Sequence, residues 1–296
     1  MKLVTFHSET GLRLGAMVRG GVLDLVAAGE RVGRVLPASM QALIDAGDRS
    51  WDEARRVIEA CPEEAVITAP RLTAPLTRPV RLRDACLFLQ HLEVSFAAIG
   101  IPFSEEFYKQ IIYYNADNLH VFGTDEEIVW PRASVERDYE LEWACVVGRS
   151  GSNVPRETAS QYIFGYTIFN DWSARDLQMP FMKANLGPAG GKDFANSLGP
   201  CIVTPDELVD PYALRMSARV NGETWSDGST STMHHSFEDA IGRLSDDRSL
   251  VAGEVIGSGT VLNGCGLEIG KLLSPGDVVE LEVEGIGVLR NRIALT

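Results

Sequence analysis

Short runs of alternating apolar and polar residues, separated by turn residues, recur along this chain. In residues 1–30 they predict short strands, with a hairpin turn at the Gly-Gly pair 20–21. Residues 38–60 carry apolar side chains at helical spacing, which predicts a helix that is broken near Gly47. Several prolines follow within residues 62–80, which is typical of a linker.

Beyond residue 80 the pattern predicts mainly short strands. Residues 84–123 have weak periodicity and favour a helix and a loop that cover a site. After a strand over residues 162–170, Ser173 is predicted to cap a short helix that ends at Gln178. Further strands are expected at residues 128–131, 139–148, 201–205, 212–219, 223–226, 254–261, 278–284 and 286–293, and a further helix at residues 236–244.

Many short strands and few helices indicate a mostly β fold of the α+β class. We expect two domains along the chain. A small N-terminal β/α domain would occupy residues 1–75, and a larger domain, built as a mixed β-sandwich or roll, would occupy residues 76–296.

The composition narrows the range of functions. The 296 residues carry a formal net charge of −14 and no stripe of Lys and Arg, which argues against a nucleic-acid partner. We see neither an apolar run of about eighteen residues nor a secretory signal, so we expect a cytoplasmic protein with no membrane partner. The cysteines are odd in number, scattered and without a CxxC pair, so we expect them to be reduced and none to bind zinc. They are Cys61, Cys86, Cys145, Cys201 and Cys265.

Two carboxylates, Glu140 and Glu142, stand two residues apart in a predicted strand. Side chains alternate between the faces of a strand, so both point the same way, with Cα atoms roughly 6.5–7 Å apart. Such a pair suits a hard cation that prefers oxygen ligands, namely Mg²⁺, Mn²⁺ or Ca²⁺. Asp171, at the end of another apolar strand, could supply a third oxygen. The simpler alternative is that Glu140 and Glu142 form the solvent-facing side of an edge strand.

Longer motifs surround these carboxylates, at residues 138–142 (Asp-Tyr-Glu-Leu-Glu), at residues 165–178 and at the pair Gly191-Lys192. Together they resemble the fumarylacetoacetate hydrolase family, and the resemblance runs from about residue 80 to residue 296. It implies that the larger domain has the fold of that family. Residues 1–75 resemble the small N-terminal domain that longer members of the family carry.

The resemblance implies a bound divalent cation. In this family the two glutamates and the aspartate after the strand hold Mg²⁺ or a similar ion, which corresponds here to Glu140, Glu142 and Asp171. Longer members add an aspartate seven residues before a catalytic histidine. Asp84 stands seven residues before His91 and is therefore expected as a fourth ligand, with a surface aspartate as the alternative.

The resemblance also implies that His91 is the general base that takes a proton from water, with help from a glutamate. Many short members place that glutamate three residues after the histidine, where this chain has Val94. Glu93 lies two residues after His91 and would face away from it on a helix. Glu268 lies where longer members supply the glutamate from their C-terminal region, and we favour it over Glu93.

Further residues match positions that contact the substrate in the family. Arg175, Gln178 and Lys192 match positions that bind it and stabilise developing negative charge, so Lys192 is expected to be catalytic. Thr260 matches a Gly-Thr element that meets the substrate carboxylate, with a role in a turn as the alternative. Tyr114 is expected to line the pocket, unless it packs in the core.

The resemblance predicts a metal-dependent hydrolase that cleaves a C–C bond in a 2,4-dioxo acid and releases a carboxylic acid and a 2-oxo acid. The substrate would be an acylpyruvate or a 2,4-diketo-3-deoxy sugar acid. The same site suits oxaloacetate decarboxylation and keto–enol or double-bond isomerisation, and a non-catalytic small-molecule binding protein is the alternative from another class. Family members usually pair as homodimers, which is expected here as well.

Overall fold

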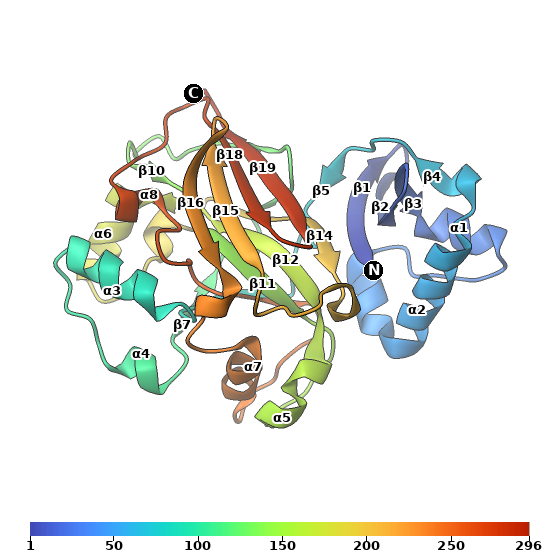
Figure 1. Ribbon diagram of the computed structural model, residues 1–296, viewed down its shortest axis with the longest axis horizontal. Helices are drawn as coiled ribbons and strands as arrows, with labels where there is room; N and C mark the ends of the chain where they lie inside the picture. The colour runs from blue at the N-terminus through green and yellow to red at the C-terminus, as the bar shows by residue number, and fades with distance from the viewer. Residues whose placement is uncertain (296) are drawn as a thin grey trace.

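The strand that carries Glu142, β11 (Leu141–Val147), lies inside a twelve-stranded sheet (Figure 1). The computed structural model describes residues 1–295. β11 pairs antiparallel with β12 (Ile163–Asp171) on one side and with β17 (Glu254–Gly257) on the other. The start of β11 and the end of β12 therefore lie side by side at the same edge of the sheet, where the strands end.

Both faces of β11 are buried, which explains its composition. Trp143 and Cys145 belong to one hydrophobic core, whereas Ala144 and Val146 belong to a second core on the opposite face. A strand that is covered on both sides reads as a continuous apolar run rather than as an alternating one. The second core also contains residues of the two N-terminal helices, such as Leu25 and Leu43, so these helices pack on the same face of the sheet as Ala144 and Val146.

The twelve-stranded sheet begins in the N-terminal part of the chain and continues into the C-terminal part, because β1 pairs with β14. The parts of the chain before and after the predicted boundary at residues 75 and 76 therefore contribute strands to the same sheet. The division into two domains stays a prediction. The order of its strands is β4 (Val66–Ile67), β3 (Gly21–Asp24), β2 (Gly11–Val18), β1 (Lys2–Ser8), β14 (Asn196–Val203), β12, β11, β17, β6 (Arg81–Ala85) and β7 (Tyr113–Ala116), with β5 (Leu72–Thr73) on β1 and β8 (Val121–Phe122) on β14.

A second sheet of five strands packs over the other face of β11 and completes the larger core. Trp143 of β11 meets Phe237 of a helix and belongs to the same core as Met216 and Leu281 of this second sheet. The predicted β-rich mixed fold is confirmed. The strand order is β16 (Glu223–Ser229), β15 (Arg215–Val220), β18 (Val278–Val283), β19 (Gly287–Ile293) and β9 (Glu127–Ile128), and β10 (Arg137–Asp138) pairs separately with β13 (Ser173–Ala174).

The helices fall into groups around the sheets (Figure 1). The predicted break near Gly47 is confirmed, because this residue has a φ of 69° inside α2. A capping box formed by Ser236 and Asp239 starts α7. The α-helices are α1 (Leu25–Arg31), α2 (Met40–Ala60), α3 (Leu89–Ala98), α4 (Glu106–Lys109), α5 (Arg156–Ala159), α6 (Arg175–Lys183), α7 (Phe237–Ser245) and α8 (Gly266–Ile269), and short 3₁₀ turns span Glu63–Ala65, Ser160–Tyr162, Ala189–Gly191, Pro205–Glu207 and Thr230–Thr232.

The predicted start and end of the helix after β12 were wrong. Ser173 is not its N-cap, since the residue lies in β13, pairs with Asp138 of β10 and donates its hydroxyl to the carbonyl of Asp171. The helix α6 begins two residues later, at Arg175, and continues to Lys183. Pairing with a distant strand thus decided the conformation of Ser173 against its local preference.

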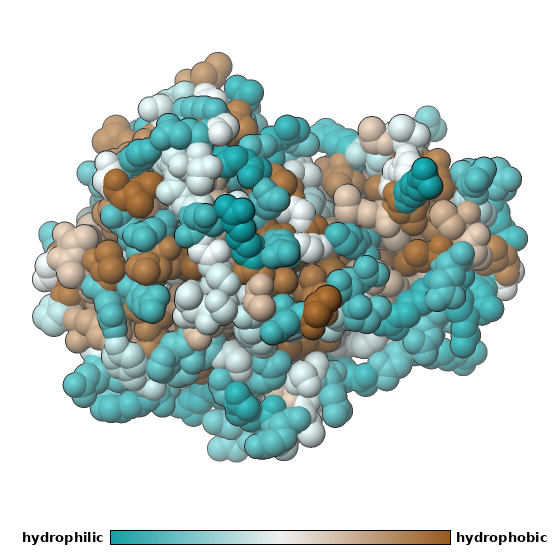
Figure 2. Space-filling view, in the orientation of Figure 1, coloured by the Kyte–Doolittle hydropathy of each residue, from teal (hydrophilic) through white to brown (hydrophobic). Residues whose placement is uncertain are grey.

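Hydrophilic and apolar residues share the surface (Figure 2). On the face shown in Figure 2 hydrophilic residues prevail, and brown apolar surface is visible at the left, where Figure 1 places α3. Within residues 1–295, none of the helices has the length and apolar character needed to cross a membrane. The five cysteines are all free in the described chain, as expected from their number and spacing.

Candidate active site

A cavity of about 500 Å³ opens beside the edge of the sheet where β6 ends and β11 begins. Helices α3, α4 and α6 and the loop before β14 supply its other walls. Most of the predicted site residues meet there. Those that line it are Asp84, His91, Tyr114, Glu140, Arg175, Gln178, Lys192 and Thr260.

Three carboxylates form a buried cluster at the sheet edge, which we call the acidic triad: Asp84, Glu142 and Asp171. One oxygen of each lies within 4.8 Å of the others. Asp84 comes from β6, which is separated from β11 by β17. It stands opposite Gly257 of β17, where a Cβ atom would lie only 2.7 Å from the Asp84 carboxylate. The glycine thus leaves the space through which Asp84 reaches Glu142.

The acidic triad is suited to a divalent cation. Burial raises the pKa of Asp84 to about 7 and that of Asp171 to about 6, and it holds the pKa of Glu142 well above its usual range. The negative charges of the neighbouring carboxylates add to the rise for Asp84 and Glu142. In the described part of the chain, Oε2 of Glu142 and Oδ1 of Asp171 are buried without a hydrogen-bond partner. Such oxygens are the ligands that Mg²⁺, Mn²⁺ and Ca²⁺ prefer.

Glu140 lies next to the acidic triad but is held by two cations. Its carboxylate accepts hydrogen bonds from Arg175 Nη1 at 2.8 Å and from Lys192 Nζ at 2.6 Å. Lys192 also donates to Asp171 and so bridges Glu140 to the triad. Burial raises the pKa of Glu140, but Lys192 and Arg175 outweigh it and lower the pKa overall. The structure therefore brings all four predicted ligands together, although Glu140 meets the others through Lys192.

Asp138 organises this side of the cavity, and the sequence analysis did not single it out as a site residue. Its carboxylate accepts hydrogen bonds from Arg175 Nε at 2.8 Å and Nη2 at 2.6 Å. It also accepts from the backbone N–H groups of Gly266, at 2.6 Å, and Leu267, at 3.0 Å. Asp138 thereby orients Arg175 and anchors the start of α8. Its place at the head of the 138–142 motif was the available signal.

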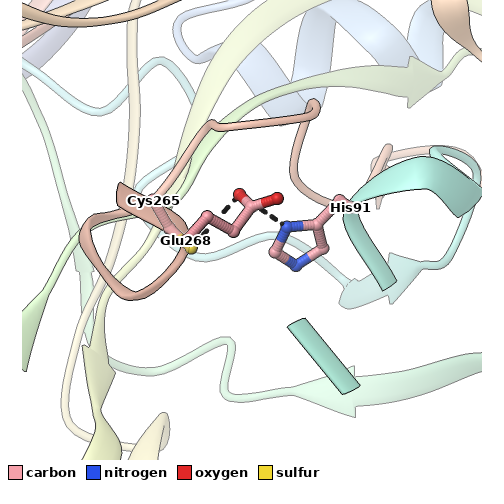
Figure 3. A group of neighbouring side chains, drawn as sticks. All are labelled: His91, Cys265 and Glu268. Carbon is pink, nitrogen blue, oxygen red and sulfur yellow. Dashed lines mark hydrogen bonds and ion pairs between the residues drawn. The ribbon is translucent and has the colours of Figure 1, made fainter. Parts of the chain in front are cut away.

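His91 pairs with Glu268, as Figure 3 shows. The Nδ1 atom of His91 lies 2.9 Å from Glu268 Oε2, and the thiol of Cys265 donates to the same oxygen at 3.4 Å. A carboxylate on Nδ1 favours the tautomer with a proton there, which leaves Nε2 free to accept one. Glu93 is exposed and accepts a hydrogen bond from Tyr108 instead. Of the two candidate glutamates, Glu268 is the one in contact with His91.

Three further residues that were predicted to contact the substrate each form a hydrogen bond with a charged residue of the site. Gln178 accepts a hydrogen bond from Arg175 at 3.1 Å. The hydroxyl of Thr260 donates to Glu142 at 3.2 Å, and that of Tyr114 donates to Asp171 at 2.7 Å. In the structure Gly191 packs against α6, where a Cβ atom would lie 2.5 Å from Gln178.

A known protein family matches most of this chain. The profile of the family described as "Fumarylacetoacetate (FAA) hydrolase C-terminal" matches residues 84–294. This chain belongs to the fumarylacetoacetate hydrolase family. The family includes hydrolases as well as isomerases and tautomerases.

Known proteins match this chain over 73–100% of its length. The mitochondrial oxaloacetate tautomerase Fahd2a of Rattus norvegicus is 31% identical over 304 residues, which cover 99% of this chain and 91% of the relative. The structure of a fumarylacetoacetate hydrolase from Exiguobacterium antarcticum superimposes with a TM-score of 0.80 at 26% identity and covers 100% of both chains. A fumarylpyruvate hydrolase from Pseudomonas aeruginosa, solved with Mn²⁺ and pyruvate, shares the fold at 21% identity with a TM-score of 0.63, over 73% of this chain and 90% of that one.

The first prediction concerns metal binding by the acidic triad. Replacing Glu142 by Gln removes a charge without removing volume. We expect Mg²⁺ affinity, measured by isothermal titration calorimetry, to fall by more than the roughly 10–100-fold typical of residues that only support a ligand. Glu157→Gln, on exposed α5, is the matched control and should bind Mg²⁺ like the unaltered protein. Unchanged affinity in Glu142→Gln would remove Glu142 from the ligand set.

The second prediction concerns pH and the metal-free protein. The pKa of Asp84 in the folded state, about 7, lies above its ordinary value of 3.8. The folded chain thus keeps a proton that the unfolded chain releases, so its stability contribution is complete below pH ~4 and is lost as the pH rises towards 7. In EDTA, the free energy of unfolding should decrease from pH 5 to pH 8 less steeply in Asp84→Asn than in the unaltered protein. Equal slopes in urea unfolding would contradict the assignment.

Proposed function

We propose that this protein is a divalent-metal-dependent hydrolase that cleaves a C–C bond in a 2,4-dioxo acid of the acylpyruvate type. The observation that carries the proposal is the His91–Glu268 pair, because His91 lines the same cavity as Asp84 of the acidic triad. A histidine oriented by a carboxylate is a base for water, and a site for a hard cation beside it suits a chelating 2-oxo acid. The family membership supports both parts.

The cation would be bound by carboxylates at the sheet edge. Asp84, Glu142 and Asp171, with Glu140 beside them, would hold the cation, for which Mg²⁺ is our first candidate and Mn²⁺ the second. When bound, such an ion supplies Lewis acidity towards the oxygens of the 2-oxo acid. The Mn²⁺ found in the fumarylpyruvate hydrolase of Pseudomonas aeruginosa supports an ion of this class.

His91 would take a proton from water at Nε2 while Glu268 holds its Nδ1 proton. The water oxygen adds to the C4 carbonyl, the C3–C4 bond breaks, and a proton returns to C3, so that a carboxylic acid and a 2-oxo acid leave. Lys192 and Gln178 line the cavity and would stabilise the oxyanion at C4. Arg175 is fixed by Asp138 and so keeps Glu140 in position.

A second candidate is keto–enol tautomerisation of oxaloacetate. It is favoured by the rat relative, which is named for that reaction and is 31% identical over nearly all of this chain. In this case His91 would carry a proton between the C3 carbon and the enol oxygen, and no water would add. The two reactions need the same base and differ in the substrate: a 2,4-dioxo acid has a ketone at C4 to which water can add, whereas C4 of oxaloacetate is a carboxylate and only a proton moves.

The deciding experiment measures both reactions with Mg²⁺ and with EDTA. An acylpyruvate assay follows the loss of the enol absorbance together with the release of pyruvate, whereas the oxaloacetate assay follows the enol absorbance alone. Metal-dependent pyruvate release from the acylpyruvate is the expected result. Tautomerisation of oxaloacetate without any cleavage of acylpyruvates would refute the hydrolase and establish the second candidate.

The third prediction concerns the His91–Glu268 pair. Glu268→Gln and His91→Asn should each lower kcat for cleavage by about 10²–10⁴-fold, because the base for water is lost or misoriented. Mg²⁺ binding by calorimetry should persist in both variants, since neither residue belongs to the acidic triad. Glu93→Gln alters an exposed carboxylate two residues from His91 and serves as the control with unaltered cleavage. Full cleavage by Glu268→Gln would exclude the pair as the source of the nucleophile.

A further inference from the structure

Helix α3 lines the cavity with one face whose chemistry changes along its length. His91 lies in the first turn and is followed on the same side by Leu92, Phe96 and Ile99. Leu92, Phe96 and Ile99 follow one another at intervals of four and three residues, as expected for one helix face, and Ile99 directly follows the last residue of the helix. Eight residues separate His91 from Ile99, which corresponds to about 12 Å along the axis. The wall therefore extends well beyond the reacting end and is apolar there.

Helix α6 shows the same gradient on another wall. Arg175 and Gln178 occupy its first turns and are hydrogen-bonded to each other beside the carboxylates. Met179 and Met182 line the cavity farther along the helix. Both helices thus start at the carboxylates and become apolar away from them. Methionine side chains are flexible and adapt to ligands of different shape.

The aromatic residue Phe107 of α4 also lines the cavity and contacts Phe96 of its apolar wall. Its ring lies 5.7 Å from that of Phe96, edge to face, and 5.3 Å from that of Phe103, stacked. Such contacts fix the rings relative to one another. In Figure 2 apolar surface is also visible where α3 lies, so the hydrophobic character of this region continues to the exterior.

The apolar end has no cation to offer a second carboxylate. Among the described residues that line the cavity, the basic side chains are His91, Arg175 and Lys192. Arg175 is engaged by Asp138, Glu140 and Gln178, and Lys192 by Glu140 and Asp171, whereas His91 holds Glu268. All three stand at the charged end. Placing an unpaired carboxylate among phenylalanine and methionine side chains would carry a large desolvation cost.

We propose that the group attached at C4 of the substrate is a hydrophobic alkyl or aryl group, and that dicarboxylic substrates are selected against. The inference rests on the proposed function for its orientation: with the 2-oxo acid at the acidic triad and His91 at the C4 carbonyl, the remaining acyl group extends along α3 and α6. Leu92, Phe96, Ile99, Met179 and Met182 would then form the specificity pocket.

Binding provides the fourth prediction and does not depend on turnover. Calorimetry with Mg²⁺ compares 2-oxooctanoate, which has an alkyl tail, with a 2-oxo dicarboxylic acid of equal length. The alkyl compound should bind at least about tenfold more tightly, and shortening its tail should weaken binding about fourfold per methylene. Equal binding, or tighter binding of the dicarboxylic acid, would overturn the inference whatever reaction the enzyme performs.

Variants of α3 and α6 localise the preference. Ile99→Arg and Met182→Lys place a cation at the apolar end and should reduce the preference for the alkyl compound at least about tenfold. Val94→Arg adds the same charge to an exposed position of α3 that does not line the cavity, and its preference should match the unaltered protein. If Val94→Arg changed the preference as much as Ile99→Arg, the pocket assignment would be wrong.

Turnover separates this inference from the proposed function. Among acylpyruvates, kcat/KM should rise from acetylpyruvate to benzoylpyruvate and to long alkyl homologues. Preferential binding of the alkyl 2-oxo acid without cleavage of any acylpyruvate would refute the hydrolase and leave the hydrophobic pocket standing. Cleavage of acetylpyruvate and fumarylpyruvate at rates equal to the alkyl homologues would support the hydrolase and overturn the pocket.

Discussion

The burial of the acidic triad is the constraint on which this site depends. Asp84, Glu142 and Asp171 are withdrawn from water at one sheet edge, and an isolated buried carboxylate is strongly disfavoured unless a proton or a cation compensates it. The pKa values of the three are raised for this reason. Lys192 offsets part of the charge on Asp171, and the remaining unpartnered oxygens create the demand for a divalent ion.

The sheet makes that arrangement possible because it holds the carboxylates rigidly. Adjacent antiparallel strands bring the start of β11 beside the end of β12, and Gly257 of the intervening strand admits Asp84 from β6. One hydrophobic core packs on each face of β11. Electrostatic repulsion within the triad is therefore resisted by packing, which is how a folded protein can store an unfavourable charge cluster at a functional site.

The reacting groups are coupled to this cluster through Asp138. That residue binds Arg175, which holds Glu140, and it also binds the backbone at the start of α8, which carries Glu268. The base and the cation site are consequently positioned by one buried carboxylate. The opposite end of the cavity has no such network and is shaped by hydrophobic packing of α3, α4 and α6, so the two ends can select the two ends of a substrate by different physical means.

Local sequence patterns were sufficient for the features that depend on neighbouring residues. The break of α2 at Gly47 follows from backbone freedom, and the helix expected over residues 236–244 corresponds to α7. The motifs around Glu140 and Asp171 were long enough to indicate the family. The tertiary structure alone decided which glutamate contacts His91, that Glu140 is held by Lys192, and that Ser173 joins a strand instead of capping a helix. These outcomes rest on contacts between residues far apart in the chain, whose distances are set by how the sheets and helices pack and not by spacing along the sequence.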